Sequence, residues 1–299
     1  MVVNMTTSAD KMGNTTQLEA AIGMKAQFED VITATQLHRL NVTLNRRDPL
    51  PKEGDPVPWG WHSIFFPRLI PTDKLSRDGM APDFEGAPDS PLPRRMYAGN
   101  DLHFHEPLHV GDHALKETWI QSVQPKEGRS GKLVFVTYAV RITGPRGLVL
   151  EDEQKIVFRD EIASGESNAA EPVTEPVAID APWKRAMIID PIMLFRFSAV
   201  TFNPHRIHYD YPYVKQVENY PSLVVHGPLT AIWLLELVRE HWQDKAMHMT
   251  GLRMRAKAPL YANSRIVLLG EPAVDGKSCR LWAVDDAGKL AMEIMADFK

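Results

Sequence analysis

Residues 197–210 carry the side chains best suited to chemistry in this chain of 299 residues. The run reads Phe-Ser-Ala-Val-Thr-Phe-Asn-Pro-His-Arg-Ile-His-Tyr-Asp. The imidazole of His208 titrates near neutral pH, so it can take up a proton and return it. The amide of Asn203 can hold a water molecule beside it. These residue types fit the addition of water to a double bond conjugated with a carbonyl group, or the reverse elimination.

A second part of such a site follows at His226-Gly227-Pro228, just before the apolar stretch 229–242. Proline suits the first turn of a helix, where its missing N–H costs nothing. The first N–H groups of a helix lack intrahelical partners, and the helix dipole is positive at that end. The backbone N–H of Gly227 is therefore predicted to hold a carbonyl oxygen while negative charge builds on it.

Ordinary structural roles remain open for several of these residues. An Asn-Pro pair is common in turns, Asp210 stands where it could cap a helix, and His208 could be a buried histidine of the core. The pairs His103/His105 and His205/His208 have spacings that occur in metal sites, but no cluster of further ligands accompanies them. We therefore expect no bound metal.

Two helices and two hairpins are predicted to position these groups. Residues 33–44 show helical apolar spacing, and residues 229–242 are apolar nearly all round, which indicates a buried helix. Turn signals at 144–147 and 285–288 are each followed by a strand pattern. The stretch 163–180 is small, acidic and proline-containing, which is typical of a linker.

The two sides of this linker resemble each other, because residues 107–112 and 259–264 share a pattern and similar strand and turn signals follow both. Several features in the same order indicate an internal duplication. One helix followed by long antiparallel strands, twice, is an α+β pattern. The segment 58–94 is predicted to be an irregular arm. We predict an N-terminal unit at 1–162 that shapes the substrate tunnel, a linker at 163–180 and a C-terminal catalytic unit at 181–299.

Composition excludes several classes of protein. The formal net charge of −4 gives no basic excess, which argues against a nucleic-acid partner. Cys279 is the only cysteine, so a reducing compartment is expected. The polar first residues lack the apolar segment of a secretory signal. The longest apolar stretch, 229–238, contains Glu236 and is too short to span a bilayer. We expect no membrane partner and a cytoplasmic protein, or a mitochondrial matrix protein if eukaryotic.

These residues together resemble the MaoC-like hydratases and dehydratases. The motif of that family reads Asp-x-Asn-Pro-[Leu/Ile]-His, and a helix that opens with His-Gly or Pro-Gly follows it. Asn203 matches the motif asparagine, and His208 matches the motif histidine after an insertion of two residues. Gly227 matches the glycine whose N–H holds the thioester carbonyl.

The whole run 197–210 is similar to one branch of that family, which contains mitochondrial hydroxyacyl-thioester dehydratase and bacterial mesaconyl-CoA and itaconyl-CoA hydratases. The resemblance extends from about Phe28 to the end of the chain. One residue departs from the motif: its leading aspartate aligns with Thr201, whose hydroxyl is no base near neutral pH. Either His208 works with Asn203 and an ordered water, or another carboxylate, with Asp210 the nearest, replaces the aspartate.

The resemblance implies a double hotdog fold, in which each unit is a long helix wrapped by an antiparallel sheet. It implies a hydro-lyase that reversibly hydrates a 2-enoyl thioester or dehydrates a 3-hydroxyacyl thioester, preferably on a small dicarboxylic acyl-CoA of the mesaconyl or itaconyl kind. Coenzyme A then enters as part of the substrate, and no other cofactor is expected. The family further implies homodimers or higher homo-oligomers.

Four residues are predicted to contact the substrate. Arg206 is the first candidate to bind a second carboxylate, since a guanidinium forms two parallel hydrogen bonds with it. Arg94 and Arg95 form a basic pair able to meet a phosphate, and His226 adjoins Gly227. Three rival functions stay open. These are a 3-hydroxyacyl-thioester dehydratase of fatty-acid synthesis, a thioesterase, and a non-catalytic acyl-thioester-binding protein, which the loss of the aspartate suggests.

Overall fold

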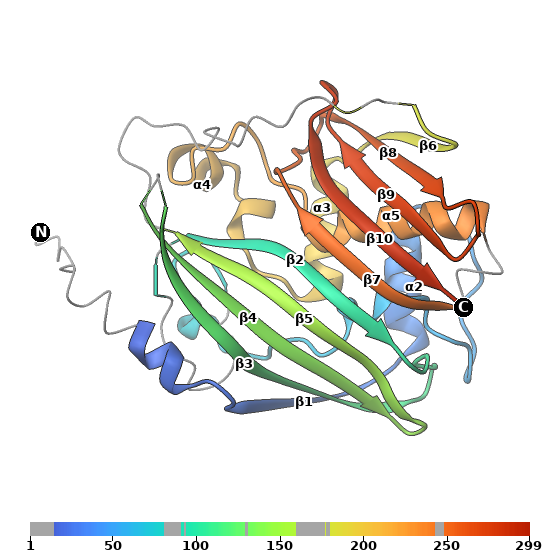
Figure 1. Ribbon diagram of the computed structural model, residues 1–299, viewed down its shortest axis with the longest axis horizontal. Helices are drawn as coiled ribbons and strands as arrows, with labels where there is room; N and C mark the ends of the chain where they lie inside the picture. Colours follow the sequence, from blue (N-terminus) through green and yellow to red (C-terminus); the bar gives the residue numbers. More distant parts are fainter. Residues whose placement is uncertain are drawn as a thin grey trace, which may run out of the picture.

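Within the residues described, ten strands form one continuous antiparallel sheet in this computed structural model (Figure 1). The structure describes residues 15–80, 91–92, 94–128, 131–159, 177, 180–242 and 248–299. The strands are β1 Lys25–Val31, β2 Arg94–Phe104, β3 His113–Gly128, β4 Gly131–Gly144, β5 Gly147–Arg159, β6 Trp183–Ile188, β7 Met249–Ala256, β8 Arg265–Pro272, β9 Ser278–Val284 and β10 Leu290–Phe298.

The order of the strands repeats between the two halves of the chain. The sheet runs β1-β3-β4-β5-β2-β7-β10-β9-β8-β6. Read inward from its two edges, the first half gives β1-β3-β4-β5-β2 and the second gives β6-β8-β9-β10-β7. If the five strands of each half are numbered one to five along the chain, both halves have the order 1-3-4-5-2 from the outer edge to the centre. This identity of topology supports the internal duplication predicted from the sequence.

The two halves meet where β2 pairs with β7, from Gly99 opposite Arg255 to His103 opposite Gly251. The pairing of β2 with β5 shifts register between Tyr97 and Gly99. Gly99 has a φ of +147°, and a Cβ there would collide with the carbonyl oxygen of Met254. A glycine is therefore required for the two backbones to approach at this junction.

Helices α2 and α5 lie behind the sheet in the view of Figure 1, and α4 lies beyond its edge. Helix α5 packs on β6, β8, β9 and β10, whereas α2 packs on α3 and on η1. The predicted helices at 33–44 and 229–242 are confirmed as α2 and α5, while α3 was not predicted. The helices are α2 Ala34–Thr43, α3 Pro191–Thr201, α4 Tyr211–Gln216 and α5 Gly227–His241, with short 3-10 helices η1 Trp61–Ile64, η2 Thr72–Lys74 and η3 Arg206–His208.

Helix α5 is buried from Leu229 to Val238, and this burial includes the acidic Glu236. Burial of a carboxylate requires partners. The carboxylate of Glu236 pairs with Arg46 and Arg239 and accepts a hydrogen bond from Nε1 of Trp61 at 3.3 Å. The ion pair with Arg46 ties the segment that follows α2 to the central helix of the other half.

The two halves differ in what covers the inner face of their strands. We expected a long helix in each unit, but α2 has ten residues and packs mainly on α3 and η1. The inner face of the first half lines a cavity instead. Its apolar residues there are Leu102, Phe104, Val140, Ile142 and Leu150.

The connections agree with the predicted turns, since 144–147 joins β4 to β5 and 285–288 lies between β9 and β10. The described part of the predicted arm, 58–80, contains only short 3-10 helices. The predicted linker 163–180 falls outside the described residues except at 177 and 180, so its boundaries stay a prediction. No helix in the described ranges is long and apolar enough to cross a membrane.

Candidate active site

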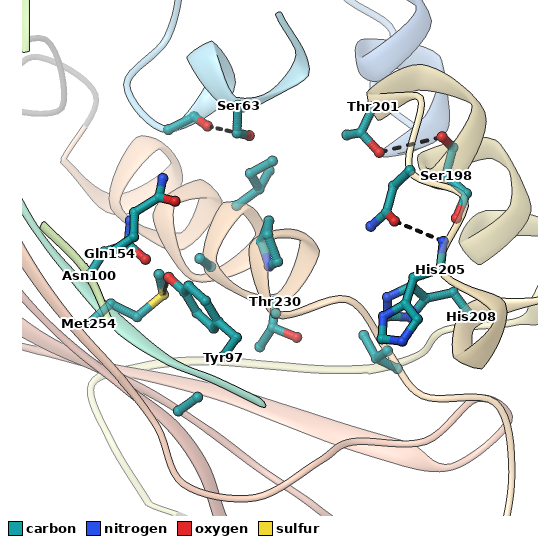
Figure 2. Close-up of a pocket in the computed structure, with 18 of the residues that line it drawn as sticks. Ser63, Tyr97, Asn100, Gln154, Ser198, Thr201, His205, His208, Thr230 and Met254 are labelled. Carbon is teal, nitrogen blue, oxygen red and sulfur yellow. Dashed lines mark hydrogen bonds between the residues drawn. The ribbon is translucent and has the colours of Figure 1, made fainter. Parts of the chain in front are cut away.

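A cavity of about 930 Å³ is bounded by residues of both halves of the chain. The first half contributes the inner face of its sheet, and the second contributes the loop after α3 and the start of α5. In Figure 2, His205 and His208 lie across this cavity from Asn100 and Gln154. The cavity therefore brings the predicted motif residues of one half against the sheet of the other.

His208 is held with one ring nitrogen bound and the other available. It ends the 3-10 helix η3 and is 7% exposed. Its Nδ1 lies 2.7 Å from the carbonyl oxygen of Val224. A carbonyl oxygen only accepts hydrogen bonds, so Nδ1 carries the hydrogen and Nε2 keeps its lone pair. His208 is thus prepared to act as a base through Nε2.

His226 supports His208 from beneath and does not line the cavity. The two imidazole rings are stacked, with centroids 3.6 Å apart and planes at 20°. Nε2 of His226 lies 2.9 Å from the hydroxyl of Ser198 on α3. His226 is 1% exposed, so the structure does not place this predicted substrate contact where a substrate would reach it.

Burial keeps the histidines of this region neutral. Desolvation, with a smaller contribution from the charge of His205, lowers the pKa of His208 to about 3. Desolvation also lowers the pKa of His226 well below its ordinary value. At neutral pH both imidazoles are therefore uncharged, which is the state in which Nε2 of His208 can accept a proton.

Gly227 begins α5, and no side chain caps this end of the helix. Helices α2 and α3 begin differently, because Thr33 and Asp190 accept backbone N–H groups at 3.3 and 2.8 Å. Gly227 lines the cavity, and a Cβ there would stand 3.4 Å from Cδ1 of Tyr97. The uncapped start of α5 thus adjoins a cavity that a thioester carbonyl could enter.

Asn203 and Thr201 also line the cavity. The side-chain oxygen of Asn203 accepts the backbone N–H of His205 at 3.0 Å, so its amide nitrogen remains to donate a hydrogen bond. The hydroxyl of Thr201 donates to the carbonyl oxygen of Phe197 at 2.8 Å. Asn203 can therefore hold a water or a carbonyl, whereas Thr201 can only accept a hydrogen bond there.

Arg206 and Asp210 lie outside the lining of the cavity and bind each other. Nε and Nη2 of Arg206 lie 3.0 and 2.7 Å from one carboxylate oxygen of Asp210, and its guanidinium covers the ring of Tyr213 at 4.0 Å. The other oxygen of Asp210 caps α4 by accepting the N–H of Tyr213. The structure therefore places neither predicted side chain in the lining of the cavity, because Arg206 binds Asp210 and both oxygens of Asp210 are used by Arg206 and α4.

The predicted pair Arg94-Arg95 divides between two places. Arg95 lines the cavity, and its positive charge contributes, after burial, to lowering the pKa of His205. Arg94 lies beside Tyr220, whose ring lines the cavity. Of the two arginines, only Arg95 is among the described residues that line the cavity.

The structure adds residues that the sequence did not single out as site residues. His205 lines the cavity beside His208, and Asp78 lies next to it with a carboxylate oxygen 3.7 Å from Nε2 of His205. His205 stood inside the motif as part of its insertion, so a signal existed for it. Asp78 comes from a segment without a recognisable pattern, and only the fold brings it there.

A group of polar side chains lies on the first-half wall of the cavity, made of Asn100, Lys116, Asp152 and Gln154. Gln154 donates to the carboxylate of Asp152 at 2.9 Å, and Asn100 donates to the same oxygen. Burial raises the pKa of Asp152 to about 7. The second oxygen of Asp152 and the side-chain oxygen of Asn100 are buried without a hydrogen-bond partner. We call these four residues the polar wall.

The histidines considered for metal binding are placed separately. His105 is exposed and pairs with Glu151 at 3.3 Å, while His205 and His208 face the cavity. Within the described ranges, no three His, Cys, Asp or Glu side chains lie close enough together to hold a metal ion.

Comparison with known proteins agrees with the fold and the motif. The family model for hydroxyacyl-thioester dehydratase type 2 matches residues 60–262. A mesaconyl-C(4)-CoA hydratase of Chloroflexus aurantiacus is 40% identical over 92% of this chain and 96% of its own length. A mitochondrial hydroxyacyl-thioester dehydratase type 2 of Schizosaccharomyces pombe is 24% identical over 80% of this chain and 87% of its own.

A solved structure shows the same architecture. A conserved hypothetical protein of Mycobacterium tuberculosis, described as a double hotdog fold, superposes with a TM-score of 0.58 at 12% identity. The match covers 93% of this chain and 96% of that chain. The α+β double hotdog fold predicted from the sequence is confirmed.

Proposed function

The chain belongs to the hydroxyacyl-thioester dehydratase type 2 family, and from this premise we propose that it hydrates the double bond of a small dicarboxylic enoyl-CoA. The family makes it a hydro-lyase of acyl thioesters, which confirms the predicted reaction class. The proposal concerns the acyl group and the roles of the residues. A relative of 40% identity that is named for mesaconyl-C(4)-CoA supports this acyl group.

The observation that carries the reaction is the meeting of a basic nitrogen and an uncapped helix end in one cavity. Nε2 of His208 takes a proton from water as the water oxygen bonds to the β-carbon. The electrons of the double bond move toward the thioester oxygen, which the N–H of Gly227 binds. The proton then passes from His208 to the α-carbon, and the thioester carbonyl re-forms. Dehydration runs the same steps backward.

The second carboxylate of the substrate requires a cation near these groups. Arg206 is bound to Asp210 outside the cavity lining, so it cannot supply one. Arg95 lines the cavity on the side of His205, and its guanidinium suits a carboxylate. We therefore propose that Arg95 binds the second carboxylate of the substrate.

The polar wall supports a short or polar acyl group over a long apolar one. Its side chains could hydrogen-bond a polar acyl group, whereas a methylene chain would offer them no partner.

A matched pair of arginine variants tests this proposal. We expect the unaltered protein to hydrate mesaconyl-CoA faster than crotonyl-CoA, with octenoyl-CoA the slowest. Arg95→Gln should lower kcat/KM for mesaconyl-CoA by about 10-fold or more, because charged hydrogen bonds contribute roughly 1.5–3 kcal/mol, and should affect crotonyl-CoA much less. Arg206→Gln is the control and should treat both substrates alike. The measurement is the gain of one water in the acyl-CoA, followed by mass spectrometry.

Selective loss on mesaconyl-CoA in the Arg206 variant, with the Arg95 variant unaffected, would reverse the assignment of the arginines. Turnover of octenoyl-CoA above that of mesaconyl-CoA would reject the dicarboxylic substrate altogether.

The second candidate function is dehydration of 3-hydroxyacyl thioesters in fatty-acid synthesis. The family model and the mitochondrial relative favour it, as does a cavity of about 930 Å³, which exceeds the volume of a four-carbon acyl group. Competition between an acyl-CoA and the matching acyl-carrier-protein substrate separates the two. Preference for the carrier protein would support the fatty-acid pathway.

We propose that the reaction uses no cofactor beyond the coenzyme A of its substrate, since the proton transfers need only imidazole and backbone groups. We also propose a homo-oligomer. Ile188, Ile192 and Phe195 are 61%, 68% and 64% exposed, an apolar exposure that a second copy would cover. A cytoplasmic location, or a mitochondrial matrix location in a eukaryote, remains our expectation.

A further inference from the structure

The place of the motif aspartate holds no group that could replace it. Thr201 stands there, and its hydroxyl donates within α3 to the carbonyl oxygens of Phe197 and Ser198 at 2.8 and 3.4 Å. A neutral hydroxyl is not a base at neutral pH, and this one has already used its hydrogen. His208 therefore needs another partner to hold the attacking water.

His205 is the acid–base group that lies nearest to His208 in the cavity. The two rings meet edge to face, with centroids 5.3 Å apart and planes at 87°. The side chain of His205 is 16% exposed, and its backbone N–H is fixed by Asn203. Figure 2 shows the two histidines side by side. Both rings can therefore reach one bound water molecule.

Asp78 orients His205 from outside the cavity lining. One carboxylate oxygen of Asp78 lies 3.7 Å from Nε2 of His205, and the other accepts the backbone N–H of Met80 and the hydroxyl of Ser76. The carbonyl oxygen of Asp78 accepts the N–H of Arg206 at 2.8 Å. A carboxylate beside Nε2 favours the tautomer with hydrogen there, which leaves the lone pair on Nδ1.

Glycine permits this close packing of the segment 76–80 on the motif loop. Gly79 has a φ of +87°, and a Cβ there would collide with the carbonyl oxygen of Pro204. The turn that carries Asp78 is thus seated directly on the residue before His205. Asp78 and His205 therefore behave as one unit held by backbone contacts on both sides.

We propose that His205, oriented by Asp78, is a second catalytic histidine that binds the attacking water in place of the missing aspartate. This inference rests on the proposed hydration. Water donates one hydrogen to Nδ1 of His205 and the other to Nε2 of His208. The hydrogen that faces His208 passes from the water to Nε2 as the oxygen–carbon bond forms, and it later reaches the α-carbon. The hydrogen on His205 stays with the new hydroxyl group, so His205 gains and loses no proton.

A double-mutant cycle tests this pair. His205→Asn should lower kcat by about 10-fold to 100-fold, and Asp78→Asn by about 10-fold, each with KM changed by less than about threefold. Because Asp78 acts through His205, the double variant should be no slower than His205→Asn alone. The asparagine at 78 keeps the oxygen that binds Ser76 and Met80, so it removes the charge and preserves the turn.

Ser76→Ala is the matched control, because it removes one support of the turn and leaves the carboxylate in place. It should keep kcat unchanged. If Asp78→Asn keeps full kcat, or if the two single losses in kcat multiply in the double variant, the proposal is wrong and the pair has only a structural role. If His205→Asn fails to fold, the kcat of Asp78→Asn alone tests the proposal. Absence of hydration by the unaltered protein would reject the proposed function itself, which is a separate result.

Discussion

His208 shows how much a single residue depends on the backbone around it. The carbonyl of Val224 fixes its tautomer, and His226 supports the face of its ring. We predict that His208→Ala lowers turnover by about 100-fold or more, since general acid–base groups contribute about that factor. Turnover and the near-ultraviolet circular dichroism spectrum should be measured together. A folded variant with normal turnover would remove His208 from the reaction.

For single residues, the sequence indicated which residues could lie at the site better than it indicated where their side chains point. The structure brings His208, Asn203, Thr201 and Gly227 to one cavity, and their roles stay predictions until they are tested. Arg206 stands between two of these residues in the sequence and still points away from the cavity. The direction of a side chain in an irregular loop follows from its contacts, and no spacing rule exists for loops as it does for helices and strands.

Among the elements, the start of α5 is the one that the proposed reaction uses to hold the thioester carbonyl. We predict that Gly227→Ala folds normally, because its Cβ meets Tyr97 at an ordinary 3.4 Å and no positive φ is required. Gly227→Val adds two methyl groups and should lower turnover on every acyl-CoA alike, since it crowds the thioester. Initial rates on crotonyl-CoA and mesaconyl-CoA provide the measurement. Unchanged activity of the valine variant on short acyl groups would argue against a carbonyl at this helix end.

The sequence predicted some of the helices and turns and missed others. Residues 33–44 and 229–242 became α2 and α5, and both hairpin turns formed where glycine and aspartate indicated them. Helix α3 was missed because its sequence, PIMLFRFSAVT, is apolar without a polar face that would reveal its period. The sequence also predicted a long helix in each half, whereas α2 has ten residues and a cavity lies against part of the first-half sheet. The position of α2 depends on its contacts with α3 of the other half, which a pattern within one half does not contain.

For the whole molecule, buried histidines should make stability depend on pH. Burial lowers the pKa of His62 and His205 to about 4, of His208 to about 3, and of His226 well below its ordinary value. Below about pH 6.5 the unfolded chain protonates these histidines and the folded protein does not. Asp152 opposes this trend, because its raised pKa of about 7 favours the folded state as pH falls. Four histidines outweigh one carboxyl group.

We therefore predict that the free energy of unfolding decreases as the pH is lowered from about 6.5 to about 5. Urea titrations across this range supply the measurement. His62→Gln removes one such histidine and should make the decrease shallower by up to about 1.4 kcal/mol per pH unit. A stability that is constant over this range would show that the histidines take up protons in the folded protein as well.

The difference between the inner faces of the two halves also has an evolutionary meaning. Both halves share one strand order, yet α5 packs on the strands of the second half, and the cavity lies against the inner face of the first. In the proposed reaction the second copy carries the acid–base residues, so the first copy can change where it contacts the acyl group without disturbing them. Proteins that descend from this duplication should therefore differ in the acyl group they accept, through changes in β2, β4 and β5, and should keep the same residues around the histidines.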